Sequence, residues 1–218
     1  MRKRNLYKDI VNGAILISSI LLCLNLYNHY QKQHTLYHFT IQSSQELTAK
    51  DAAELQKLSG LVRFEPAAYV PVTLKLEGYT LETTLEGVDL ESYPLDWKEA
   101  EGTITLGNTA ALFFGEGIFQ SFSEAHGYHP GKAQVKKWLE KYQELSVEVT
   151  DETGRTRTGR IFGILKTGDQ MVCMDKAQME EIFQGSSKIM GGYMEIYGLR
   201  NMEQAKAALE QGGILVGE

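Results

Sequence analysis

The chain has 218 residues, 43% of them hydrophobic, which is enough for one or two compact domains with a core. The first thirty residues carry a net charge of +3, so the chain's total of −6 leaves −9 for the remainder. This acidity argues against nucleic acid or anionic lipid as the main partner, although it is also an ordinary means of keeping a domain soluble. The only two cysteines, Cys23 and Cys173, exclude a framework of several disulfides.

The N-terminus places basic residues ahead of an apolar stretch. Four positive charges lie within residues 1–9, and residues 10–27 contain no Asp, Glu, Lys, Arg or His. Eighteen residues at about 1.5 Å each cover about 27 Å, close to the thickness of the hydrocarbon core. Because basic residues stay in the cytoplasm, we expect a cytoplasmic tail over 1–9, a single transmembrane helix in the cell membrane over 10–27, and an extracytoplasmic C-terminal domain.

Three other interpretations of the apolar stretch are less favoured. A cleaved signal peptide ends in small residues, but this stretch ends in large ones. A lipoprotein would place a small residue before Cys23, where Leu22 stands. A buried core helix does not account for the flanking charges and the uniform apolarity. The stretch is therefore interpreted as an uncleaved anchor.

The segment after the anchor is predicted to lead into a folded domain. Residues 28–44 are polar and aromatic, which is typical of a stalk or of an extension of the anchor helix. The extracytoplasmic domain is expected over 45–218, and residues 45–59 open it with a helical pattern. Thr48 is suited to cap this helix, with Asp51 three residues later as a shorter substitute for the glutamate of a capping box.

The apolar patterning of the remaining residues predicts an α+β fold with one mixed sheet. Alternating or short apolar segments predict strands at 61–64, 69–76, 79–87, 103–106, 145–149, 159–165, 171–174, 193–197 and 214–216. Capped or amphipathic segments predict helices at 108–114, 131–142, 176–183 and 202–209. The turns at 77–78 and 151–154 predict two hairpins. The closing strand–helix–strand run predicts two strands paired in parallel.

Motifs for catalysis or metal binding are weak in this sequence. His126 and His129 lie near Gly127 and Pro130, which predicts a surface loop without the third ligand that zinc requires. Four clustered acids lack the spacing of a calcium loop and predict a solvated face: Glu86, Asp89, Glu91 and Asp96. Nucleotide and hydrolase motifs are absent from the sequence. We therefore expect no enzyme activity, and we assign no catalytic, metal-binding or cofactor-binding residue.

Four phenylalanines lie within ten residues of one another: Phe113, Phe114, Phe119 and Phe122. The favoured interpretation is that they fill a core between two subdomains. The functional alternative is an apolar patch for a partner protein or a lipophilic ligand.

Several segments together resemble the extracytoplasmic core domain of MacB-like, FtsX-type ABC-transporter permeases. The similar segments are 58–66 (LSGLVRFEP), 84–89 (TLEGVD), 101–112 (EGTITLGNTAAL), and 160–165 (RIFGIL) with 171–175 (MVCMD). The resemblance covers residues 45–216, and the anchor stands where the family's first transmembrane helix stands. Residues 115–142 depart from the family's pattern. The resemblance implies a mixed-sheet α+β domain of MacB-like core type, in two subdomains.

The resemblance also sets our expectation for function. In full permeases three further transmembrane helices follow this domain, whereas the sequence ends at Glu218. We therefore expect a non-enzymatic accessory or degenerate subunit of an FtsX/MacB-like ABC export or signalling complex. The alternative is a stand-alone extracytoplasmic binding protein for a lipophilic or peptide ligand, which would use a cleft lined by 113–122. A third possibility, an envelope hydrolase, requires acids and histidines to converge in one pocket.

The expected partners are the lipid bilayer and a membrane protein, either a permease or an ATPase complex. Polar residues within the anchor are candidates for contact with a partner's helix: Asn12, Ser18, Ser19 and Asn25. Single polar residues near helix ends are also common at the membrane interface.

Overall fold

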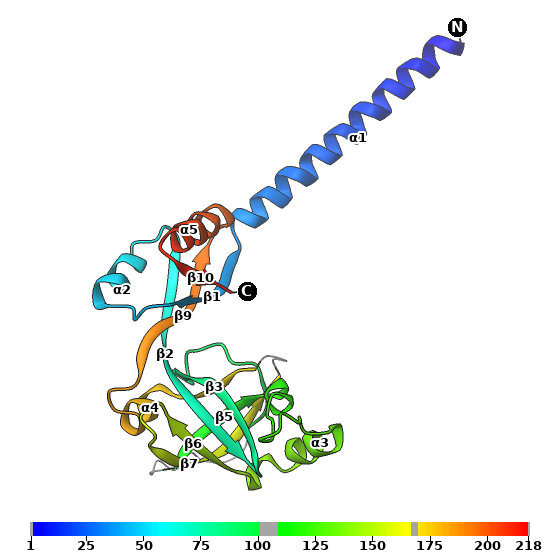
Figure 1. The fold of residues 1–218 in the computed structure, drawn as a ribbon. Helices are drawn as coiled ribbons and strands as arrows, with labels where there is room; N and C mark the ends of the chain where they lie inside the picture. The colour runs from blue at the N-terminus through cyan, green and yellow to red at the C-terminus, as the bar shows by residue number, and fades with distance from the viewer. Residues whose placement is uncertain (1, 101–108, 167–169, 218) are drawn as a thin grey trace.

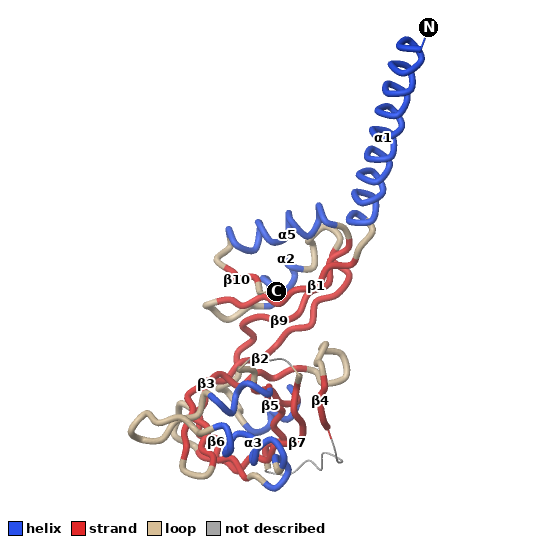
Figure 2. Tube along the Cα trace, turned by 90° about the vertical axis from the view of Figure 1, so that its right-hand side faces the viewer, coloured by secondary structure: helices blue, strands red, loops and turns tan. Residues whose placement is uncertain are grey.

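The computed structural model describes residues 2–100, 109–166 and 170–217, with side chains from residue 17 onward except 99 and 100. A long helix, α1 (Arg2–Gln33), projects from a body of two lobes (Figures 1 and 2). Two long strands connect the lobes, β2 (Leu61–Leu76) and β9 (Lys188–Tyr197). The described residues form helices and a sheet with both parallel and antiparallel pairs, so the predicted α+β class is confirmed.

The lobe next to α1, here called the helix-proximal lobe, is a four-stranded sheet in the order β10-β1-β9-β2. Its own elements are β1 (Leu36–Ser43), α2 (Ala49–Leu55), α5 (Leu199–Gln211) and β10 (Ile214–Val216). Helix α5 covers the sheet, and its Ala205 and Leu209 share a core with Phe39, Ile41 and Leu55. This lobe therefore pairs β1, the first strand of the chain, with β10, its last described strand.

Two predictions about this lobe were wrong. Residues 28–44 are not all stalk, because α1 ends at Gln33 and Leu36–Ser43 forms β1, with Phe39 and Ile41 buried. The closing strands β9 and β10 run parallel but do not pair, because β1 lies between them and is antiparallel to both. The alternation of apolar and polar residues in β1 is short, so this segment forms a strand only because the distant strands β9 and β10 pair with it.

The other lobe is a closed barrel. Its strands are β3 (Tyr79–Val88), β4 (Trp97–Ala100), β5 (Ala110–Gly115), β6 (Ser146–Asp151), β7 (Thr156–Leu165) and β8 (Val172–Asp175), together with the second half of β2. The pairing runs β2-β3-β8-β5-β7-β6 and returns to β2, because β6 pairs with both β7 and β2. Strand β4 lies outside this ring on β7. The interior is filled by apolar side chains such as Leu74, Leu85 and Val149.

Short helices cover the barrel. Helix α4 (Lys176–Ile182) packs Met179 into the main core, beside β3. The 3₁₀ helix η1 (Glu116–Gln120) and α3 (Lys132–Glu140) cover another part of it and contribute Phe119 and Trp138. A second 3₁₀ turn, η2 (Tyr142–Glu144), leads into β6. The core of this lobe is therefore continuous from the barrel interior to its helical cover.

Most local predictions in the body are confirmed. Thr48 caps α2, and the capping box with Asp51 is complete. Both hairpins form at the predicted turns. The helix predicted at 108–114 was wrong, because Ala110–Gly115 is β5, which is buried along its whole length between β7 and β8. The strand predicted at 103–106 lies outside the described residues.

Candidate functional site

Helix α1 carries exposed apolar side chains on every described side. The exposed fractions of Ile17, Ile20 and Leu22 are 59%, 52% and 61%. Because successive helical residues are about 100° apart, these three side chains point in different directions. The predicted span 10–27 begins before residue 17, outside the described side chains. Within the described part, no helix has both the length and the apolarity of a membrane span.

The polar residues proposed for helix contact lie along the same projection. Ser18, Ser19 and Asn25 are on its exposed surface, whereas Asn12 belongs to the part of α1 whose side chains are not described. Their role in contact with a partner's helix stays a prediction.

The junction between α1 and the helix-proximal lobe is built from polar and aromatic groups. His34 Nδ1 lies 2.7 Å from the hydroxyl of Tyr197 at the end of β9. The His34 ring also packs on Tyr30 with 4.1 Å between ring centroids. The backbone N–H of Gly198 donates to the carbonyl of Thr35 at 2.9 Å. These contacts fix the direction in which α1 leaves the lobe.

An arginine network lies where the two lobes meet. Arg63 on β2 donates to Glu65 at 2.9 Å, and its other nitrogens reach Glu195 on β9 at 3.7 Å and the backbone carbonyl of Ser92. The hydroxyl of Tyr193 donates to the same Glu195 carboxylate at 3.0 Å. The hydrogen bond with Glu65 raises the pKa of Arg63. The network therefore joins both connecting strands to the loop that follows β3.

Glu86 is a carboxylate largely withdrawn from water. It stands on β3 between Tyr69 of β2 and Cys173 of β8. Burial raises the pKa of Glu86 from its usual 4.5 to about 7. Burial also raises the pKa of Tyr93 in the neighbouring loop, and the charge of Glu86 raises it further. Among the described residues no lysine or arginine forms an ion pair with it. The predicted solvated acidic face therefore holds only for Asp89, Glu91 and Asp96, which are exposed.

The four clustered phenylalanines are core residues. Phe114, Phe119 and Phe122 are fully buried together beneath Trp138, and Phe113 is 3% exposed in the adjoining cluster with Trp97. They do not form an exposed patch or line a cleft, so the alternative prediction of a ligand surface there was wrong. Phe114, Phe119 and Phe122 belong to the core of the barrel lobe, where η1 folds back over β5. Phe113 shares its cluster with Ala67 of β2 and Tyr193 of β9, the two strands that connect the lobes.

The two histidines lie between η1 and α3. His126 and His129 lie on an exposed loop, and His129 Nδ1 is 2.9 Å from the carbonyl of Phe122. No group of three potential metal-binding side chains exists among the described residues. Cys173 is fully buried, and burial raises the pKa of its thiol, as expected for a small core residue.

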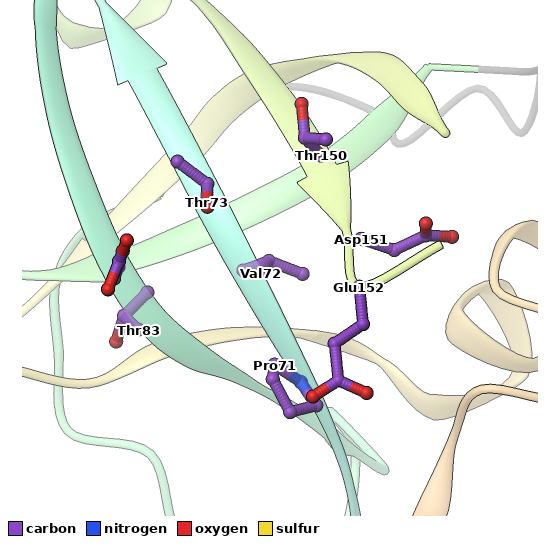
Figure 3. Close-up of a pocket in the computed structure, with 8 residues that line it drawn as sticks. Pro71, Val72, Thr73, Thr83, Thr150, Asp151 and Glu152 are labelled. Atoms are coloured by element: carbon purple, nitrogen blue, oxygen red, sulfur yellow. The ribbon is translucent and has the colours of Figure 1, made fainter. Parts of the chain in front are cut away.

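A small hollow rich in hydroxyl groups lies on the outside of the barrel, and Figure 3 shows its lining. Thr73, Thr83 and Thr150 come from β2, β3 and β6, with Glu152 at the turn. Asp151 beside them is committed to the turn, since it accepts from Thr153 and Arg155. The volume of this hollow, about 180 Å³, is below the range of about 300–1,000 Å³ that is usual for small-molecule sites.

Larger hollows lie on both lobes. The α3 groove on the barrel, about 420 Å³, is lined by basic and apolar side chains: Gln120, His129, Pro130, Lys132, Val135, Lys136 and Leu139. A wider hollow of about 770 Å³ shares its Gln120 and His129. The α2–α5 groove on the helix-proximal lobe, about 330 Å³, is lined by Ser43, Gln45, Glu46, Leu47, Asp51, Glu54, Leu55, Leu58, Ala208, Leu209, Gly212 and Ile214.

Sequence comparison leaves the chain without an assigned family. No family model matches the sequence. No curated protein matches it at a significant level either.

Two of the solved structures that this fold is similar to are ectodomains of transporters. The extracellular domain of the noncanonic ABC-type transporter YknZ from Gram-positive bacteria is 14% identical with a TM-score of 0.45, and the match covers 84% of this chain and 100% of that domain. The periplasmic region of MacB from Actinobacillus actinomycetemcomitans is 13% identical with a TM-score of 0.46, and the match covers 82% and 87%. Two of the structures that this chain is similar to are thus the extracellular domain of an ABC-type transporter and the periplasmic region of MacB.

Proposed function

We propose that this chain is a non-enzymatic extracytoplasmic module held at the cell membrane by α1. We further propose that it acts as an accessory subunit of an FtsX/MacB-like ABC export or signalling complex. In this arrangement the N-terminal tail is cytoplasmic, and both lobes lie outside the cytoplasm.

The observation that carries the membrane attachment is α1 itself. Its described apolar side chains face in all directions and are exposed at 52–61% from Ile17 to Leu26. A helix that is apolar all round is stable only inside a protein core or in lipid. Since α1 projects away from both lobes (Figure 1), lipid or the helix of a partner must supply its surroundings. The basic residues at its start favour a cytoplasmic N-terminus.

The class of partner rests on the resemblance in the sequence. Its similar segments fall on elements that build the body: 58–66 on the start of β2, 84–89 on the end of β3, 160–165 on β7 and 171–175 on β8. In the family, a domain with these segments is the extracytoplasmic part of a permease that works with an ATPase. The expected partner of this chain is a protein of that kind.

A binding role agrees better than catalysis with the described side chains. The candidate catalytic groups are apart: Cys173 is inside the barrel lobe, His126 and His129 are on an exposed loop, and Glu86 lies against tyrosines. The grooves hold no convergence of acid, base and nucleophile among their lining residues. The proposed activity is therefore recognition of another protein.

Co-purification in mild detergent tests this proposal. The full chain with an affinity tag should recover a permease or an ATPase of an ABC complex, and replacing Ser18, Ser19 and Asn25 by leucine should lower the recovery. A matched control exchanges Ile20 for leucine and Leu24 for isoleucine, which keeps α1 apolar and should leave the recovery unchanged. Recovery of the chain alone, with neither permease nor ATPase, contradicts the proposal.

A further inference from the structure

The α2–α5 groove combines an apolar floor with an acidic rim. Leu55 and Leu209 are 6% and 3% exposed and form the floor, and Leu47, Leu58 and Ile214 are half-buried around it. These side chains belong to the core of the helix-proximal lobe, which reaches the surface between the two helices. The groove therefore presents leucine and isoleucine side chains that a partner could cover.

The charges that line the groove all have one sign. Glu46, Asp51 and Glu54 stand around the apolar floor, and no lysine or arginine is among the lining residues. Asp51 is engaged by the cap of α2, where its carboxylate accepts from the N–H of Thr48 at 2.8 Å and from its hydroxyl at 2.7 Å. Glu46 and Glu54 are exposed, and neither forms an ion pair with a described residue. Two carboxylates on the rim are thus available to a basic partner.

The position of the groove restricts which protein can reach it. It lies on the helix-proximal lobe, from which α1 departs (Figures 1 and 2). If α1 is in the membrane, as the proposed function requires, this lobe is the one nearer the bilayer. A segment that emerges from a neighbouring protein in the same membrane is therefore well placed to enter the groove. The α3 groove on the other lobe has basic lining residues and would select the opposite charge.

We propose that the α2–α5 groove binds a basic amphipathic segment of a second membrane protein. Its leucine-like side chains cover Leu55, Leu58 and Leu209, and its lysines or arginines pair with Glu46 and Glu54. The complementarity of charge excludes an acidic segment, because it would place like charges beside unpaired carboxylates. This inference rests on the proposed function for the choice of a partner in the same membrane.

Peptide binding to the full chain in detergent tests the inference. The probe is a short fluorescent peptide with leucines at three- and four-residue spacing and lysines elsewhere, and its matched control replaces every lysine by glutamate. Fluorescence anisotropy should detect binding of the basic peptide only. The double variant Glu46→Gln with Glu54→Gln should bind it about fivefold more weakly, which is about 1 kcal/mol. Glu91→Gln with Glu152→Gln makes the same change of charge elsewhere and should leave the affinity unchanged.

The outcomes separate this inference from the proposed function. Equal binding of both peptides, absence of binding, or equal loss in both double variants overturns the inference. If co-purification succeeds while the peptide test fails, the proposed function stands and the groove is not its docking site. If the peptide binds as expected but no permease or ATPase co-purifies, the groove is a basic-segment site and the proposed function is wrong.

Discussion

Glu77 occupies the turn between β2 and β3 with a φ of +47°, a backbone conformation that residues other than glycine rarely adopt. Its Oε2 accepts hydrogen bonds from Trp138 Nε1 and Gln134 Nε2, both at 2.8 Å. Trp138 is fully buried over the phenylalanine cluster, so this carboxylate holds α3 on the barrel. The energy of these contacts compensates for the unfavourable backbone conformation.

Removing the acceptor should destabilise the barrel lobe. We expect Glu77→Ala to lower the free energy of unfolding by about 1–3 kcal/mol, because the buried N–H of Trp138 loses its partner. Glu77→Gln keeps an acceptor oxygen at the same backbone conformation and should lose less. Urea denaturation of the two variants measures the difference. Equal losses would show that the hydrogen bonds do not hold α3.

Glu86 predicts a dependence of stability on pH. Its pKa rises from 4.5 to about 7 on folding, so the folded state binds the proton more tightly than the unfolded chain. Its stabilising contribution is therefore complete below pH 4.5, declines as the pH rises through about 7, and is absent above that. The full difference corresponds to about 3 kcal/mol.

Urea denaturation at about pH 5 and about pH 8 measures this effect. The wild type should lose stability between these values, and Glu86→Gln should lose less and should be more stable than the wild type at the higher pH. Glu82→Gln changes an exposed carboxylate on the same strand and serves as the control. The same pH dependence in the wild type and in Glu86→Gln would contradict the role given to burial.

At the scale of elements, β9 depends on two glycines that let its neighbours approach. Gly191 pairs with Gln42 of β1 and with Ala67 of β2. A Cβ on Gly191 would overlap the carbonyl oxygen of Ile41, and a Cβ on Gly192 would overlap that of Glu65. Because these contacts are with backbone, side-chain motion cannot relieve them. The connection between the lobes therefore requires glycine here.

Gly191→Ala should disrupt the central pairing of the helix-proximal lobe. We expect a loss of about 3 kcal/mol in the free energy of unfolding, at the upper end of overpacking costs. Gly131→Ala is the matched control, because an added Cβ there meets no atom within 4 Å and the φ of Gly131 is −69°. Thermal denaturation compares the two variants. A similar melting temperature for both would contradict the close approach of the strands.

Local elements could be predicted from the sequence, whereas their long-range pairing could not. The α2 cap and the two hairpins depend on residues close together in the chain, and they were predicted correctly. Strand β1 and the order β10-β1-β9 depend on segments that are far apart in the sequence. The sequence of β5 has a helical pattern, and its strand conformation depends on pairing with β7 and β8. Apolar patterning alone does not distinguish a short buried strand from a helix.

The candidate site also has parts that could be predicted and parts that could not. Helix α1, which is apolar with single polar residues, could be predicted because it is one continuous segment. The α2–α5 groove could not be predicted, because its two helices are far apart in the sequence and neither carries a motif. No signal in the sequence sets Glu86 apart from Glu82 on the same strand, because the position of Glu86 between Tyr69 and Cys173 depends on pairing with two other strands. Clustered phenylalanines indicated a core, as the structure has it.

At the scale of the whole molecule, an apolar helix leads into a lobe that also contains the end of the chain, and two strands carry the barrel beyond it (Figure 1). This arrangement places the barrel farthest from α1. The exposed Tyr128 on that lobe, 71% accessible, and Arg4 in the N-terminal tail are suited to report on the two sides of a membrane.

Labelling of single cysteines in intact cells tests the central claim most directly. With Cys23 replaced by serine and Cys173 buried, the only reactive thiol is the one introduced by Tyr128→Cys or by Arg4→Cys. A membrane-impermeant maleimide should label the Tyr128→Cys chain in intact cells and the Arg4→Cys chain only after permeabilisation, with both chains in the membrane fraction. Labelling of the Tyr128→Cys chain only after permeabilisation, or release of the chain from membranes by alkaline carbonate, would contradict a membrane-held extracytoplasmic module.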